Sequence, residues 1–211
     1  MSPAYLFDLV ILAADKDAAQ ALEGILNSMP SKLGLAAVNY RIIIAPRHDG
    51  EARTRAHELL RPFVRTARYA LVVFDREGCG SNSHREELEN QTLAKLTENG
   101  WDGRASVVVI DPELEVWVWS GSPKVDATLG WSGRRTPLRD ELKKRGFLAS
   151  GKFKPQQPKS AMLWALREAR KPRSSSLFKE LAGEVSWERC SDPAFLKLKS
   201  TLETWFTANV G

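Results

Sequence analysis

The sequence predicts an α/β fold with a mostly parallel, doubly wound sheet, followed by a basic, helical C-terminal extension. Four short apolar runs without polar alternation are typical of strands buried on both faces of a parallel sheet. They cover residues 7–13, 40–45, 70–74 and 105–110. Helical segments separate them, which is the alternation expected of β-α-β units. After residue 121 the pattern is broken by Ser, Gly and Pro, and only helical segments are expected.

The first two runs are each followed by an expected helix. Asp15 and Asp17 lie between the first run and an Ala- and Leu-rich segment with high helix propensity. Either acid could simply cap that helix, because negative charge is favoured at a helix N-terminus. The second run ends at Pro46, and an amphipathic, arginine-rich helix is expected to begin at His48 and Asp49.

The third run is followed by Asp75 and Glu77. In an extended turn this spacing lets both carboxylates face the same side. The polar loop over residues 78–83 contains two glycines and could hold a phosphate, although its glycine fingerprint is incomplete. A polar helix is expected over residues 84–99.

The fourth run leads into Asp111 and Pro112, which are expected to start a helix with Asp111 as its N-cap and Pro112 at its first position. Asp111 and Glu115 would then share one face of the first turn. Trp117 and Trp119 flank this segment, and two tryptophans here indicate packing rather than a stacking platform for bases.

Residues 1–121 are expected to form the α/β core and residues 122–211 a helical extension packed on it, within one structural domain. The first part holds 13 Lys and Arg against 17 Asp and Glu, and the second holds 18 against 9, giving net charges of −4 and +9. An acidic half suits a cation, and a basic half suits a polyanion such as DNA or RNA, although a solvated basic surface explains the second equally well. The candidate nucleic-acid-binding residues are Arg134, Arg135, Lys143, Lys144, Lys152 and Lys154.

Nothing in the sequence indicates a membrane or an oxidising compartment. No apolar run approaches the roughly 18 residues that span a bilayer, and the N-terminus lacks the pattern of a secretory signal. Cys79 and Cys190 are the only cysteines, and their spacing fits neither a zinc site nor a disulfide framework. We expect a cytoplasmic protein.

The acids that follow three of the runs are expected to converge. Carboxyl ends of parallel strands meet at one edge of a sheet, where open α/β folds bind their ligands. Carboxylates gathered there repel one another unless a cation is present, and oxygen donors with few His and no Cys suit Mg²⁺ or Mn²⁺. Such an ion would bind a phosphate and lower the pKa of a bound water, as phosphodiester cleavage requires. The acids are Asp15, Asp17, Asp75, Glu77, Asp111, Glu113 and Glu115.

Two of these segments resemble the Toprim (topoisomerase–primase) domain, and in particular its RloB-like and OLD-nuclease-like branches in bacterial defence. Val-Val-Phe-Asp-Arg-Glu at 72–77 is similar to the family's Asp-x-Asp motif, and Asp-Pro-Glu-Leu-Glu-Val-Trp at 111–117 to its Asn-Pro-x-Phe-Glu-x-Trp motif. The resemblance covers residues 6–121. It departs at 13–17, where the family's acid-Gly-x-x-acid turn is replaced by Ala-Ala-Asp-Lys-Asp, and at Glu77, which replaces an Asp.

The resemblance implies a Mg²⁺- or Mn²⁺-dependent nuclease or phosphotransferase that acts on DNA or RNA in anti-phage defence, with other defence-system proteins as further partners. The missing glycine turn motivates an alternative, which is an inactive Toprim-like module that binds nucleic acid or a partner protein. A binder of nucleotides or phosphate that uses the loop 78–83 is a third hypothesis. For the enzyme, the implied metal ligands are Asp75, Glu77, Glu115 and Asp111, and the implied catalytic residues are Asp15 and Asp17.

Overall fold

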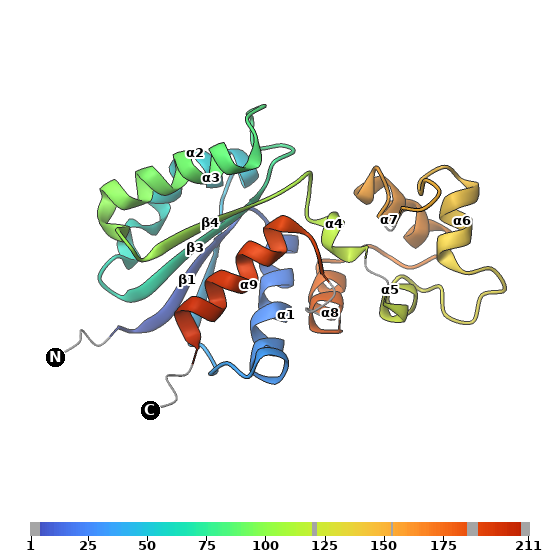
Figure 1. Ribbon diagram of the computed structural model, residues 1–211, viewed down its shortest axis with the longest axis horizontal. Coiled ribbons are helices and arrows are strands. Elements are labelled where there is room, and N and C mark those ends of the chain that lie inside the picture. Colours follow the sequence, from blue (N-terminus) through green and yellow to red (C-terminus); the bar gives the residue numbers. More distant parts are fainter. Residues whose placement is uncertain (1–4, 120–121, 153, 185–189, 208–211) are drawn as a thin grey trace.

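A four-stranded, all-parallel sheet in the order β2-β1-β3-β4 lies at the centre of one end of the molecule (Figure 1). The computed structural model describes residues 5–119, 122–152, 154–184 and 190–207. The predicted α/β class and parallel sheet are confirmed. The strands are β1 (Phe7–Ala13), β2 (Tyr40–Ile44), β3 (Ala67–Asp75) and β4 (Ala105–Ile110).

Helices cover both faces of the sheet, which explains the unbroken apolar runs. Leu9 and Ile11 of β1 point into one core cluster, and Val10 and Leu12 point into another on the opposite face. Figure 1 shows α2 and α3 on one face and α1 and α9 on the other. None of the helices in the described ranges is long and apolar enough to cross a membrane. The covering helices are α1 (Lys16–Leu33), α2 (His48–Leu60), α3 (Arg85–Leu96) and α9 (Pro193–Phe206).

The strand order reverses between β1 and β3. β1 pairs with β2 on one side and with β3 on the other, so that Ala13 lies opposite both Ile44 and Val73. Connections therefore leave these neighbouring strands in opposite directions, and the carboxyl edge at such a switch point is where open α/β sheets bind their ligands. The segments that follow β1 and β3 both begin at this edge.

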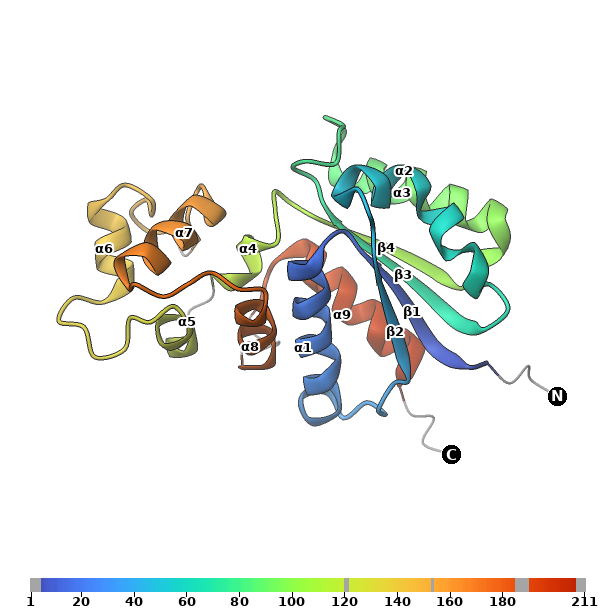
Figure 2. The same cartoon turned by 180° about the vertical axis from the view of Figure 1, so that it is seen from behind.

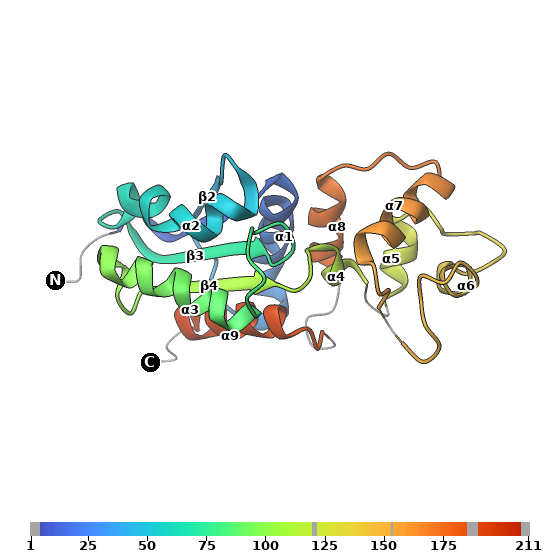
Figure 3. The same cartoon turned by 90° about the horizontal axis from the view of Figure 1, so that it is seen from above.

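The C-terminal half contributes a helical lobe and two further helices that pack on the core. A helical lobe, defined as α5, α6 and α7, lies beyond the carboxyl edge of the sheet, and α4 leads into it (Figure 3). Trp119, buried as predicted, donates its indole N–H to the carbonyl of Pro158 at the start of α7, 3.0 Å away. The helices are α4 (Glu115–Val118), α5 (Pro123–Thr128), α6 (Leu138–Lys144) and α7 (Pro158–Glu168).

The chain then returns to the core through α8 (Ser176–Glu184), which packs along α1, and through α9 (Figure 2). Gly24 makes the close packing of α1 and α8 possible. A Cβ at this position would lie 2.4 Å from the carbonyl oxygen of Lys179 and 3.0 Å from the Cβ of Ala182. The two helix backbones could not approach so closely with any larger residue at position 24.

The helix predicted to start at Asp111 and Pro112 is wrong. The peptide bond between them is cis, and α4 begins only at Glu115. Backbone pairing continues beyond the ends of β3 and β4, because the N–H of Arg76 donates to Ile110 and the N–H of Glu77 donates to Pro112. This pairing keeps the chain extended where a helix was expected.

Candidate functional site at the carboxyl edge of the sheet

Asp75 ends β3 at the switch point and lies among other carboxylates. One of its oxygens accepts a hydrogen bond from the backbone N–H of Leu114, 3.1 Å away. Burial raises the pKa of Asp75 well above its usual range, and the nearby carboxylates of Asp49, Glu115 and Asp15 raise it further. Asp75 is therefore difficult to ionise, first because it is desolvated and then because carboxylates surround it.

Asp49 belongs to this group, although the sequence analysis treated it only as the start of a helix. Its carboxylate accepts a hydrogen bond from the backbone N–H of Asp75 at 2.8 Å, and burial raises its pKa. It follows β2 just as the other acids follow β1, β3 and β4. That position was the signal that could have identified it. His48, directly before it, has a left-handed backbone with φ of 55°.

Asp15 caps a helix, as the sequence indicated, and also lies near the other acids. Its side chain caps α1 by accepting a hydrogen bond from the N–H of Ala18 at 2.8 Å. Its charge also raises the pKa values of Asp49 and Asp75, so the cap lies close to them. Capping and membership of the acidic group are therefore compatible.

Glu115 and Glu113 come from the segment that leads into the helical lobe, and both are buried. Burial raises the pKa of Glu115. Glu113 accepts a hydrogen bond from the backbone N–H of Lys159 at 3.0 Å, and its other oxygen lies 3.5 Å from the Lys159 ammonium. Glu113 therefore joins the core to the start of α7.

Two cations from the basic half reach the acids, and the sequence analysis identified neither as a site residue. Arg173, between α7 and α8, forms an ion pair with the buried carboxylate of Asp17, and its Nη2 lies 3.6 Å from Glu115 Oε1. Lys159 approaches from the start of α7. We call Asp15, Asp17, Asp49, Asp75, Glu113 and Glu115 the acidic cluster, and Arg173 and Lys159 its cation pair.

Glu77 and Asp111 lie apart from the buried acids. Both are exposed. Asp111 forms an ion pair with Arg76 at 2.7 Å, so the expectation that it shares a helical face with Glu115 is wrong. The hydrogen bond and charge of Asp111 raise the pKa of the Arg76 guanidinium, and the charge of Glu77 adds a smaller effect. The turn after β3 therefore directs Asp75 inward and Glu77 outward.

Most of the predicted nucleic-acid-binding residues have partners within the protein. Arg134 lies over the ring of Trp131, 4.5 Å from its centroid, and donates to the carbonyl of Glu168 at the end of α7. Arg135 and Lys152 are exposed. The remaining pairs are Lys143 with Asp140, Lys144 with Glu141, and Lys154 with Asp192.

The loop 78–83 is attached to α2 through its carbonyl groups. Arg53 donates to the carbonyl oxygen of Cys79 at 2.8 Å and to that of Gly80 at 3.4 Å. Cys79 itself is fully buried. These contacts explain the loop as a turn packed against α2.

The donor chemistry of the acidic cluster fits Mg²⁺ or Mn²⁺, because it consists of carboxylate oxygens without Cys. Within the described residues, however, no three His, Cys, Asp or Glu side chains are arranged as a metal-binding group. The ion pairs give a reason, since Asp17 and Glu115 are directed to Arg173 and Glu113 is directed to Lys159. A divalent ion would have to replace part of the cation pair.

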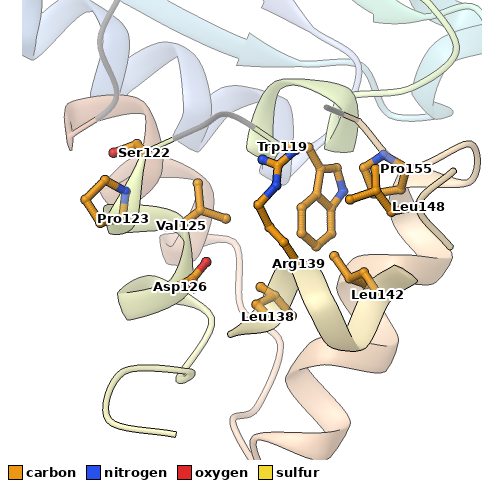
Figure 4. Close-up of a pocket in the computed structure, with 10 residues that line it drawn as sticks. All are labelled: Trp119, Ser122, Pro123, Val125, Asp126, Leu138, Arg139, Leu142, Leu148 and Pro155. Atoms are coloured by element: carbon orange, nitrogen blue, oxygen red, sulfur yellow. The ribbon is translucent and has the colours of Figure 1, made fainter. Parts of the chain in front are cut away.

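A separate cavity of about 190 Å³ lies in the helical lobe, and Figure 4 shows the residues around it. Its walls are mostly apolar and include Trp119, Leu138 and Leu142. Burial raises the pKa of Asp126, and the backbone N–H of Leu138 and the charge of Arg139 oppose this shift. Asp126 thus accepts a hydrogen bond from the backbone N–H at the start of α6.

The candidate site is the acidic cluster at the switch point of the parallel sheet. Comparison of the chain with protein-family models, with curated proteins and with solved structures gave no match.

Proposed function

We propose that the acidic cluster is the active site of a Mg²⁺- or Mn²⁺-dependent enzyme, a Toprim-like nuclease or phosphotransferase that acts on phosphodiesters of nucleic acid. The supporting observation is that the half-buried Asp75 lies at the switch point near Asp15, Asp49 and Glu115, with its pKa raised well above its usual range by desolvation and by these charges. Carboxylates held together in this way are unfavourable unless the arrangement serves a cation. Strongly shifted pKa values beside specific charged partners are characteristic of functional sites.

Asp49, Asp75 and Glu115 are the proposed ligands. A bound divalent ion would polarise a phosphate and lower the pKa of a water molecule. Asp15 is the proposed proton-transfer residue, because its hydrogen bond from Ala18 fixes the orientation of its carboxylate beside these acids. Asp17 remains a further candidate for either role. The nucleic-acid substrate, a role in anti-phage defence and defence-system partners are proposed from the Toprim resemblance.

The first test is cleavage of plasmid DNA and of RNA by the purified protein with Mg²⁺ or Mn²⁺. We expect nicking or cleavage that Asp75→Asn reduces by about 100-fold or more, the scale of losing a residue that acts on the transition state. The matched control is Asp126→Asn, which removes another acid with a raised pKa from the helical lobe. Intact DNA and RNA at high protein concentration with either metal would contradict the proposal.

Metal binding gives a second test that does not depend on the substrate. A ligand that binds only the folded protein at 100 times its Kd stabilises it by about 2.7 kcal/mol. We expect Mn²⁺ to raise the melting temperature of the wild type and of Asp126→Asn, and to have little effect on Asp75→Asn. Equal shifts in all three proteins would place the bound ion elsewhere.

The cation pair favours a second candidate, which is a non-catalytic module that binds nucleic acid or a partner protein. Arg173 and Lys159 already neutralise part of the acidic cluster without a metal ion. This candidate predicts nucleic-acid binding that weakens steeply with salt and survives Asp75→Asn. Loss of binding in that variant would exclude it.

A further inference from the structure

The cation pair lies between buried acids and the solvent. The side chain of Glu115 is 3% exposed, whereas that of Arg173 is 37% exposed and that of Lys159 is 52% exposed. Each cation therefore contacts a carboxylate inside the protein while part of its side chain remains accessible from outside. A substrate that reached the acids would meet these two side chains on its way.

The surrounding structure holds both cations in place. The guanidinium of Arg173 lies over the ring of Phe178 in α8, 5.7 Å from its centroid. The backbone of Lys159 is held at the start of α7 by its hydrogen bond to Glu113, and the Lys159 ammonium lies 3.5 Å from the other oxygen of the same carboxylate. Side chains placed in advance lose less conformational freedom when they bind a ligand.

We propose that Arg173 and Lys159 are the phosphate-binding side of the site, which rests on the proposed function of the acidic cluster. These two cations form ion pairs with the carboxylates of Asp17, Glu113 and Glu115. When the carboxylates have a divalent counter-ion, their attraction for the two side chains weakens. A phosphate oxygen of the substrate then becomes the best remaining partner, and a guanidinium binds phosphate through two parallel hydrogen bonds.

The proposal links two equilibria with opposite signs. Arg173 competes with a divalent ion for Asp17 and Glu115, so removing the guanidinium should strengthen ion binding. The same change should weaken phosphate binding, because a partner of the phosphate is lost. A purely structural ion pair predicts no effect on phosphate once the ion is bound.

The experiment measures both equilibria on the full chain. Calorimetry gives the affinity for Mn²⁺, and broadening of the ³¹P signal of inorganic phosphate by protein-bound Mn²⁺ gives the affinity for phosphate near the ion. The variants are Arg173→Gln, Arg173→Lys and Lys159→Gln. Arg135→Gln is the matched control, because it removes an exposed cation of the predicted nucleic-acid-binding set.

We expect Arg173→Gln to bind Mn²⁺ several-fold more tightly and phosphate about tenfold more weakly, on the scale of one charge-assisted hydrogen bond. Arg173→Lys should lie between the wild type and Arg173→Gln, since an ammonium cannot make the paired contact. Lys159→Gln should also weaken phosphate binding and tests the idea independently if Arg173→Gln fails to fold. Arg135→Gln should behave as the wild type.

Unchanged phosphate affinity in Arg173→Gln and Lys159→Gln, with Mn²⁺ still bound, would overturn this inference and leave the proposed function intact. Weaker Mn²⁺ binding in Arg173→Gln would also overturn it, because the guanidinium of Arg173 and Mn²⁺ would then not compete for the same carboxylates. If neither the wild type nor any of the variants binds Mn²⁺, the proposed function is wrong, and this inference is wrong with it.

Discussion

The carboxylate of Asp49, at the start of α2, accepts a hydrogen bond from the backbone N–H of Asp75 at the end of β3. This contact joins segments that follow two strands which are not neighbours, since β1 lies between β2 and β3. It places two carboxyl groups together, and the charge of Asp49 adds to the effect of burial in raising the pKa of Asp75. Four predictions follow from this and related contacts.

The stability of the protein should fall as the pH rises. Burial raises the pKa values of Asp49, Asp75 and Glu115, whereas in the unfolded chain such carboxyls ionise near pH 4. At pH values between the unfolded and the folded pKa, the folded state binds more protons than the unfolded state. The contribution of these protonated carboxyls to stability is therefore complete below about pH 4 and is lost as the pH rises through the raised pKa values. We expect a higher melting temperature at about pH 5 than at about pH 8.

The comparison variant for this pH dependence is Asp75→Asn, which removes one of the raised carboxyls and can retain the hydrogen bond from Leu114. Its melting temperature should fall less over the same interval, and at about pH 8 it should be more stable than the wild type by about 1 kcal/mol. Parallel curves for the two proteins would show that Asp75 does not have the raised pKa.

Substitutions of Asp49 should separate its structural role from its proposed metal-binding role. Asp49→Ala leaves the N–H of Asp75 without its acceptor and should cost about 1–3 kcal/mol in the free energy of unfolding. Asp49→Asn keeps an acceptor oxygen and should preserve stability while weakening Mn²⁺ binding. Urea unfolding and calorimetry measure the two effects. Full Mn²⁺ affinity in Asp49→Asn would remove this residue from the site.

Gly24 should be intolerant of a larger residue. The added Cβ of Gly24→Ala would lie 2.4 Å from the carbonyl oxygen of Lys179, so α8 must shift. We expect a loss of about 1–3 kcal/mol, as for other overpacked sites. Gly183→Ala in α8 is the control, because its Cβ meets nothing within 4 Å, and it should stabilise the helix by about 0.5–1 kcal/mol. Two equal results would show that the helices do not pack closely at Gly24.

Glu89 should be essential to the packing of β4. It is 4% exposed, accepts a hydrogen bond from the buried N–H of Val109, and forms ion pairs with Arg85 of α3 and Lys197 of α9. Glu89→Ala leaves these donors without their acceptor and should cost about 3–5 kcal/mol in urea unfolding. The exposed Glu87 in the same helix is the control, and Glu87→Ala should change stability by no more than about 0.5 kcal/mol.

Sequence reasoning placed the acids after β1, β3 and β4 at the correct edge, but it could not tell which of them point inward. Glu77 is exposed, although Asp75, two residues earlier, is half-buried and lies near the carboxylates of Asp49, Glu115 and Asp15. The prediction that a helix begins at Asp111 was wrong for a related reason. Backbone pairing beyond the ends of β3 and β4 prevents the local helix that the sequence there favours. In both cases the direction of a side chain depends on the path of a neighbouring segment.

The sequence by itself determined the α/β class, the four strands and the edge at which the acids collect, because buried apolar runs and helix-forming spacers act through local pattern. Only the tertiary structure decided which side chains share the site. Arg173 and its partner Asp17 lie 156 positions apart. Asp49 joins the acidic cluster through the sheet order, and the cation pair joins it from the far end of the chain. Charges attract according to their separation in space, and folding alone sets that separation.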